Sequence, residues 1–238
     1  MNLFEAIVGR RSVRKFKDKD VDDKLIGIIL YMATQAPSAG NSQEWKFIVV
    51  KNKELRKELA VAALRQKQLL EAPVAIVVFA DLEKASLRYS ERGEVFYSVQ
   101  DTAAAIQNML LTIHALGLAS CWIGSFDEEQ VKSLLEAPDN LRPVALLPVG
   151  YADEEPRKPE RIPFENLTWA EKYGRGYELT VATMVGREEE RLVGPLGTYL
   201  ENFFREYAEK IKEVKKEKLT FEDFIKKLKR PRKKEERF

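Results

Sequence analysis

The segment from Ser98 to Gly117 constrains the fold more than any other part of this sequence. Its apolar residues recur with the period of a helix: Ala103, Ala104, Ala105, Ile106, Met109, Leu110 and Ile113. Ser98 and Asp101 have the spacing of a capping box and predict the start of the helix, and Gly117 predicts its end. A helix this apolar must be covered by other elements, so we expect it to form the core of the domain.

Around this helix, short apolar runs alternate with helical patterns. Four runs predict strands: Trp45–Val50, Val74–Phe79, Leu118–Ile123 and Val144–Val149. Helices are predicted over Asn2–Gly9, Asp22–Ala36, Glu54–Leu70 and Glu128–Leu135. The pattern from Ala80 to Val95 is polar and mixed, and it predicts no element. Strands separated by helices predict a sheet that helices cover.

The length and the charge of the chain suggest one main domain with an appendage. A chain of 238 residues, 45% of them hydrophobic, is long enough for one good core and short for two. Charged residues make up 33%, a share that leans toward a heat-tolerant protein. The N-terminus holds no apolar stretch of secretory or membrane-spanning length, so we expect a cytoplasmic protein with no membrane contact.

The supply of reactive side chains is small. The chain has one His, His114, and one Cys, Cys121, which together cannot form a Cys/His zinc site or a histidine-based triad. We therefore expect no metal centre, and we expect that any redox or group-transfer chemistry uses a borrowed cofactor. Cys121 is favoured as a small buried residue, and His114 as a structural one.

The C-terminal third differs in character. After Tyr151, Pro156, Pro159 and Pro163 alternate with charges and predict an extended arm. Amphipathic helices are predicted over residues 195–216 and 220–228, and the last residues are expected to be disordered. Residues 209–238 hold 13 Lys and Arg against 7 Asp and Glu, a net of +6, and residues 1–208 a net of −4. A basic tail can bind nucleic acid, but its apolar stripes and interspersed Glu favour packing or dimer wrapping.

Three motifs could carry chemistry. The first is the turn from Arg10 to Arg14, whose three guanidinium groups and one hydroxyl suit a phosphate group. The second is the small-residue loop from Ala36 to Gln43, which would let a planar heterocycle approach the main chain. The third is residues 117–124, a strand freed at its end by Gly124. Each motif alone also fits a purely structural role. The first would be a solvated basic turn, the second an ordinary helix-to-strand connection, and the third a core strand with Trp122 in the core or an interface.

Taken in this order, the motifs resemble the nitroreductase family of FMN-dependent oxidoreductases. The matching segments are residues 10–16, 36–45, 108–124 and 148–151, and the resemblance covers about residues 1–172. It implies an α+β fold with a mixed, mainly antiparallel sheet covered by helices, followed by a C-terminal helical extension over residues 173–238. In many relatives Pro stands where this chain has Glu44, and a second basic residue stands near Arg161 where this chain has Pro159.

The resemblance also implies a set of cofactor contacts. Arg10 and Ser12, helped by Arg161, would hold the FMN phosphate, with Arg11 in the same motif. Arg14 would lie near the pyrimidine edge of the flavin, where positive charge favours the reduced anionic ring. Ile123 and Gly124 would offer backbone N–H groups toward flavin N5. The ring and ribityl chain would be lined by Pro37, Ser38, Ala39 and Asn41, with Gln66 as a further ring contact.

In this family two subunits share each flavin, so the resemblance implies a homodimer. NADH or NADPH would deliver hydride to the flavin and leave, and a small oxidised acceptor such as a nitroaromatic or a quinone would take its place. The chemistry would occur at flavin N5, so no side chain is named as a catalytic group. A specialised role, reductive dehalogenation or flavin cleavage, remains an alternative, as does a flavoprotein whose basic tail binds nucleic acid.

Overall fold

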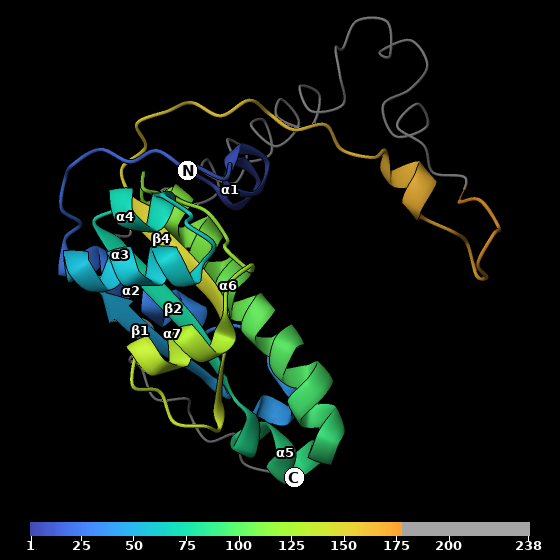
Figure 1. Ribbon diagram of the computed structural model, residues 1–238. Helices are drawn as coiled ribbons and strands as arrows, with labels where there is room; N and C mark the ends of the chain where they lie inside the picture. Colours follow the sequence, from blue (N-terminus) through green and yellow to red (C-terminus); the bar gives the residue numbers. More distant parts are fainter. Residues whose placement is uncertain (178–238) are drawn as a thin grey trace, which may run out of the picture. The chain divides into compact units, whose positions relative to one another are not determined.

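A four-stranded antiparallel sheet lies at the centre of the computed structural model, which describes residues 1–177 (Figure 1). The strand order is β1-β2-β4-β3, and the strands are β1 (Trp45–Val50), β2 (Val74–Asp81), β4 (Leu141–Gly150) and β3 (Ala119–Ser120). Every residue of β2 from Val74 to Ala80 is buried, as expected for a central strand covered on both faces. The sheet belongs to a compact unit that spans Met1–Gly176.

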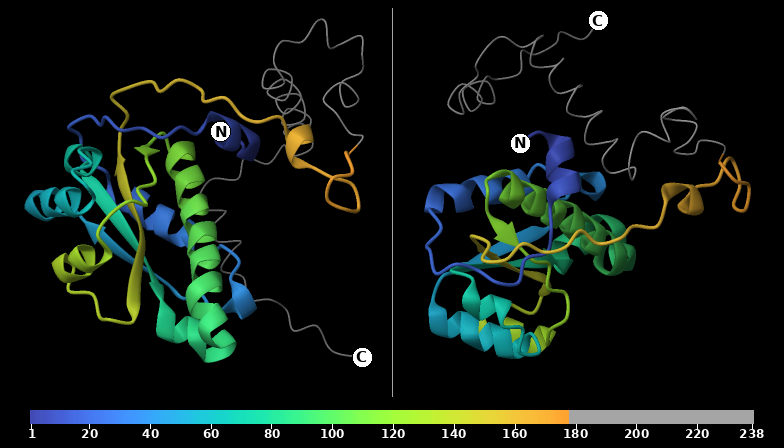
Figure 2. Two further views of the ribbon diagram at one scale, coloured as in Figure 1. Left: turned by 45° about the vertical axis from the view of Figure 1, so that its right-hand side comes forward. Right: turned by 90° about the horizontal axis from the view of Figure 1, so that it is seen from above.

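Alternate residues of the central strands enter two different apolar clusters. Val74, Ile76 and Val78 face the cluster that includes α2 (Asp23–Ala33) and α6 (Ser98–Ala115). Ala75, Val77 and Phe79 face the cluster that includes α3 (Lys53–Ala62) and α7 (Glu128–Leu134). Because side chains alternate across a strand, the sheet separates two helical layers, which the two views of Figure 2 show. The α+β class expected from the sequence is confirmed.

The helix α6 is the core element that the sequence predicted, but its start is different. Ile106 and Met109 are fully buried against the sheet and α2. The predicted capping box at Ser98 and Asp101 is wrong: Ser98 Oγ donates to the carbonyl of Glu94, and Asp101 accepts a hydrogen bond from the main chain of another segment. The helix needs no cap there because a π-helical turn, η2 (Gly93–Tyr97), runs directly into it.

Two helical regions depart from the sequence prediction. The helix α5 (Leu82–Arg92) fills the segment where none was predicted, and Asp81 caps it by accepting from the N–H of Lys84. The helix predicted over Glu54–Leu70 is split into α3 and α4 (Gln68–Glu71), because Leu64 and Arg65 adopt left-handed backbone angles, with φ of 55° and 62°. α2 also ends at Ala33, before the predicted Ala36.

The strand predicted over Leu118–Ile123 shortens to β3, with Ile123 in a separate bridge to Leu146, and β4 begins at Leu141, before the predicted Val144. Other boundaries follow the sequence closely. The capping box of Asn2 and Glu5 starts α1 (Leu3–Gly9), and β1 has its predicted bounds. Short helical turns, η1 (Ala39–Asn41) and η3 (Phe164–Leu167), lie in the small-residue loop and in the proline-rich arm. The helices predicted beyond residue 194 and the basic tail lie outside the described residues, and the domain boundary near residue 172 stays a prediction. No helix within residues 1–177 is long and apolar enough to span a bilayer.

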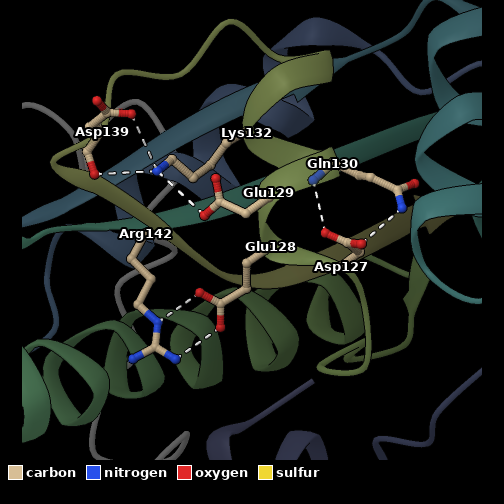
Figure 3. Close-up of polar contacts among 7 residues, drawn as sticks. All are labelled: Asp127, Glu128, Glu129, Gln130, Lys132, Asp139 and Arg142. Atoms are coloured by element: carbon tan, nitrogen blue, oxygen red, sulfur yellow. Dashed lines mark hydrogen bonds and ion pairs between the residues drawn. The ribbon is translucent and has the colours of Figure 1, made fainter.

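One charged pair joins the start of α7 to the start of β4 (Figure 3). Asp127 caps the helix by accepting from the N–H of Gln130, and Arg142 on β4 makes a two-pronged contact of 2.9 and 3.0 Å with Glu128. That contact raises the pKa of the Arg142 guanidinium. Both partners are partly exposed, so the pair contributes about 1 kcal/mol or less. The apolar clusters, and not this pair, hold the layers together.

The burial of α6 predicts a large effect of truncation in its core. Ile106→Ala removes atoms from a fully buried site and should lower the free energy of unfolding by about 2–5 kcal/mol in urea denaturation. Gln107→Ala, the exposed neighbour on the same helix, should change it by less than about 0.5 kcal/mol. Equal effects of the two changes would contradict this account of the core.

Candidate functional site

The arginine turn and the third motif, far apart in the sequence, are neighbours in the structure. Ser12 forms a parallel bridge with Ser120 of β3, and the N–H of Val13 donates to the carbonyl of Ser120 at 3.0 Å. Arg10 and Arg11 therefore lie beside the strand end that leads to Ile123 and Gly124. The sequence did not predict this pairing, because a single bridge leaves no periodic pattern.

A cavity of about 740 Å³ opens beside this turn. Its lining includes Arg10, Arg11 and Ser120, the last turn of α6 at His114, and arm residues 154–158. The hydroxyl of Ser120 is buried and has no hydrogen-bond partner among residues 1–177. Guanidinium groups, an unpartnered hydroxyl and open volume form a donor set that suits the phosphate end of a nucleotide cofactor.

Two groups of this region were not expected at the site: His114 was favoured as a structural residue, and Glu154 was not singled out. His114 lines the cavity, and burial, together with Arg10 and Arg11, lowers the pKa of its imidazole. Glu154 accepts hydrogen bonds from the N–H groups of Arg14 and Lys15, at 2.6 and 3.2 Å. The turn is thus fixed from the arm by a carboxylate, which no local sequence signal indicates.

The small-residue loop is held in an unusual backbone conformation. Gly40 and Asn41 have φ of 56° and 59°, and a Cβ at Gly40 would lie 2.6 Å from Nη1 of Arg88. Arg88 donates to the carbonyl of Gly40 at 2.9 Å, so α5, which the sequence did not predict, shapes this loop. Glycine suits the site because it tolerates both the left-handed angle and the close approach.

Two buried carboxyl groups lie beneath the same loop. The side chain of Glu44 is fully buried, and Asp101 in the first turn of α6 is 8% exposed. The N–H of Ala39 donates to Asp101 Oδ2 at 2.7 Å, and the hydroxyl of Ser42 donates to Glu44 Oε2. Burial and the hydrogen bond with Glu44 raise the pKa of Asp101 to about 6, while the Ala39 N–H opposes that rise.

The two groups of site residues lie at opposite ends of α6 (Figure 2). The loop meets the helix at Asp101, and α1 and the arginine turn meet it at His114, whose Nε2 lies 2.8 Å from where a Cβ on Gly9 would be. With a rise of about 1.5 Å per residue, these points are roughly 20 Å apart along the axis. One protomer therefore holds two separate groups of candidate site residues, here termed half-sites.

Comparison with known proteins assigns the chain to a family. A sequence model described as the Nitroreductase family matches residues 7–69 and 60–151. The chain belongs to the nitroreductase family. It is 37% identical over 174 residues to a Methanothermobacter thermautotrophicus protein provisionally named NADH dehydrogenase/NAD(P)H nitroreductase. The matched segment covers 69% of this chain and 87% of that protein.

Two further nitroreductase-like proteins extend the comparison. The Bacillus subtilis protein named FMN reductase (NADPH) is 28% identical over 71% of this chain and 74% of its own length. The crystal structure of a nitroreductase family protein from Streptococcus pneumoniae has a TM-score of 0.67 at 30% identity, covering 71% of this chain and all of that one. The fold that the resemblance implied is thus the fold of solved family members.

The other positions that the nitroreductase resemblance implied are distributed unevenly. Gln66 donates to the carbonyl of Ser125 at 3.1 Å, which places it beside Gly124. The N–H of Ile123 donates to Leu146 at 3.0 Å, so the expectation that it faces a ligand is corrected, and the N–H of Gly124 stays the prediction. Arg161 is exposed, donates to the carbonyl of Glu160 and is not among the residues that line the cavity.

The buried thiol of Cys121 should be slow to react. Burial raises the pKa of this thiol, and the opposing effects of Arg14 and the hydrogen bond with Ser12 are smaller. Because the thiolate is the reactive form, we expect labelling by a disulfide reagent at pH 8 to be at least about tenfold slower in the folded protein than in guanidinium chloride. Equal rates in the two conditions would show that Cys121 is exposed and activated.

Proposed function

We propose that this chain passes electron pairs from NADH or NADPH, through FMN, to a small oxidised acceptor such as a nitroaromatic or a quinone, in a ping-pong cycle. The arginine turn beside the cavity of about 740 Å³ and the unpartnered Ser120 hydroxyl carry the proposal. As a member of the nitroreductase family, the chain is an FMN-dependent NAD(P)H oxidoreductase. The acceptor and the order of binding are the proposed part.

The side chains of the protein bind and orient the cofactor. Arg10 and Ser12 would hold the phosphate, because both belong to the turn that is joined to β3 next to the cavity. Arg14 carries its fixed positive charge on the same turn, where it would favour negative charge on the ring. Bound FMN supplies the two-electron chemistry, and one cleft then serves donor and acceptor in turn.

The position of the half-sites supports a homodimer with shared flavins. The arginine turn and the small-residue loop are roughly 20 Å apart along α6, too far for one protomer to surround one flavin ring with both. A two-fold axis that aligns two α6 helices in opposite directions would bring the loop of one protomer to the arginine turn of the other. Such a contact would also cover apolar side chains that are exposed here: Leu3, Ile7, Val99, Ile162 and Leu167.

FMN binding should depend on Arg10. Purified protein should be yellow or become so with FMN, and anaerobic NADH or NADPH should bleach it. Arg10→Ala should weaken FMN binding about 10- to 100-fold, measured by quenching of flavin fluorescence, because a charge-assisted hydrogen bond is worth about 1.5–3 kcal/mol. The matched control Arg142→Ala removes a guanidinium near α7 and should bind FMN like the wild type. Protein that stays colourless with added FMN would disprove the proposal.

Two protomers should share each FMN site. Ser38→Trp would fill the loop half-site and Arg10→Ala would impair the phosphate half-site, so each homodimer should bind little FMN. A heterodimer of the two variants has one site with both defects and one intact site. Co-expressed, differently tagged chains should therefore recover about one FMN per dimer, measured by absorbance. Recovery of no FMN in verified heterodimers would place both half-sites of a flavin in the same protomer.

A further inference from the structure

Glu44 and Asp101 hold the small-residue loop from below, at two points. Asp101 Oδ2 accepts a hydrogen bond from the N–H of Ala39 at 2.7 Å, and Glu44 Oε2 accepts one from the hydroxyl of Ser42. These two contacts bracket η1, the turn whose positive φ angles give the loop its shape. The main chain of Glu44 is fixed as well, since its carbonyl accepts the N–H of Asp81 at 2.8 Å. The carboxyl groups are therefore built into the fold.

The two carboxyl groups lack a donor between them. Both are buried, and Glu44 Oε1 has no hydrogen-bond partner among residues 1–177. An ionised carboxyl group only accepts hydrogen bonds, so two of them cannot bond to each other. One proton held between Glu44 and Asp101 would supply the missing donor and remove the repulsion.

Within residues 1–177, no Lys or Arg forms an ion pair with either carboxyl group. On α5, Lys84 and Arg88 donate to the carbonyls of Gln43 and Gly40. On β1, Lys46 lies 3.6 Å from Asp81 of β2. Burial, the hydrogen bond with Glu44 and the charge of Glu44 all raise the pKa of Asp101, to about 6, against the opposing N–H of Ala39. The proton is therefore lost within an accessible pH range.

We propose that Glu44 and Asp101 share one proton and act as a clamp that keeps the loop of residues 37–43 in the shape that receives the flavin ring. When the proton leaves, two buried carboxylates repel each other and the contacts to Ala39 and Ser42 loosen. FMN affinity then falls. The effect on FMN rests on the proposed function, whereas the shared proton stands on the contacts of the loop itself.

The direction of the pH dependence follows from the sign of the shift. The pKa of Asp101 in the folded protein is raised to about 6 from its ordinary 3.8. The folded state therefore binds the proton more tightly than the unfolded state, and the stabilisation is complete below pH 4 and lost as the pH rises through 6. Both the order of the loop and FMN affinity should decrease between pH 5 and pH 8.

Amide substitutions separate the proton from the shape of the clamp. Glu44→Gln and Asp101→Asn keep the side-chain size, and the amide nitrogen supplies a donor that does not titrate. Each variant should hold the loop at every pH between 5 and 8. Asp127→Asn, at the cap of α7 in the other helical layer, is the matched control and should behave like the wild type.

FMN binding tests the clamp in the full-length protein. The phosphate of FMN itself titrates near pH 6, so the informative quantity is the ratio of wild-type to variant Kd at each pH, from which that titration cancels. The ratio of the wild-type Kd to the Glu44→Gln Kd should rise about three- to tenfold from pH 5 to pH 8, with a midpoint near pH 6. A ratio that is constant with pH for both Glu44→Gln and Asp101→Asn would overturn the link to FMN.

A second measurement needs no cofactor. The backbone amide resonance of Ala39 in apo protein, followed by 15N–1H NMR from pH 4.5 to 8, should shift with a midpoint near pH 6 in the wild type and in Asp127→Asn. The shift should be absent in Asp101→Asn, and its midpoint should move to lower pH in Glu44→Gln, where Asp101 titrates without a second carboxyl group beside it. Identical titration in all four proteins would overturn the shared proton. Titration in the apo protein without any FMN binding would leave the clamp standing and disprove the proposed function instead.

Discussion

The contact of α6 with the central sheet is the interaction on which the rest of the structure depends. The apolar stripe of this helix covers one face of β2 and β4, and fully buried Ile106 and Met109 fill the layer between them. Because the helix is fixed along its length by that burial, its two ends are fixed as well. The first end carries the carboxyl group that meets the small-residue loop, and the last carries His114 beside the arginine turn.

Polar groups are buried by the apolar layers at both half-sites, and some of them have no hydrogen-bond partner among residues 1–177. The carboxyl groups of Glu44 and Asp101 lie under one half-site, and the unpartnered hydroxyl of Ser120 lies at the other. Buried polar groups without partners are costly, so their presence next to a cavity or beneath a strained loop marks places where the fold serves something other than stability. Membership of the nitroreductase family indicates that this function is flavin-dependent redox chemistry.

The layers of the fold could be predicted from the sequence because periodicity reports burial directly. The short apolar run at β1 and the apolar period of α6 gave correct elements, and Asn2 gave the start of α1. Local signals failed where tertiary contacts decide the backbone. The left-handed angles at Leu64 and Arg65 split a predicted helix, and α5 forms from a polar segment that contacts the loop through Arg88.

The site was predictable in its residue types more than in its connections. Arg10, Ser12 and the small-residue loop stand out as motifs, but nothing in the sequence links Ser12 to Ser120, or Ala39 to Asp101. Long-range hydrogen bonds of this kind leave no local pattern. For the same reason Glu44 appeared only as a departure from the family, and its burial became visible with the fold.

In the proposed dimer, the length of α6 sets the spacing within two cofactor sites. The helix fixes the distance from the residues that hold the phosphate of one FMN to the residues that line the ring of the other. Adding or removing one helical turn would change this distance by about 5.4 Å in both sites. In that dimer, an insertion in the arm would leave this distance unchanged, whereas a change in the length of α6 would alter two cofactor sites at once.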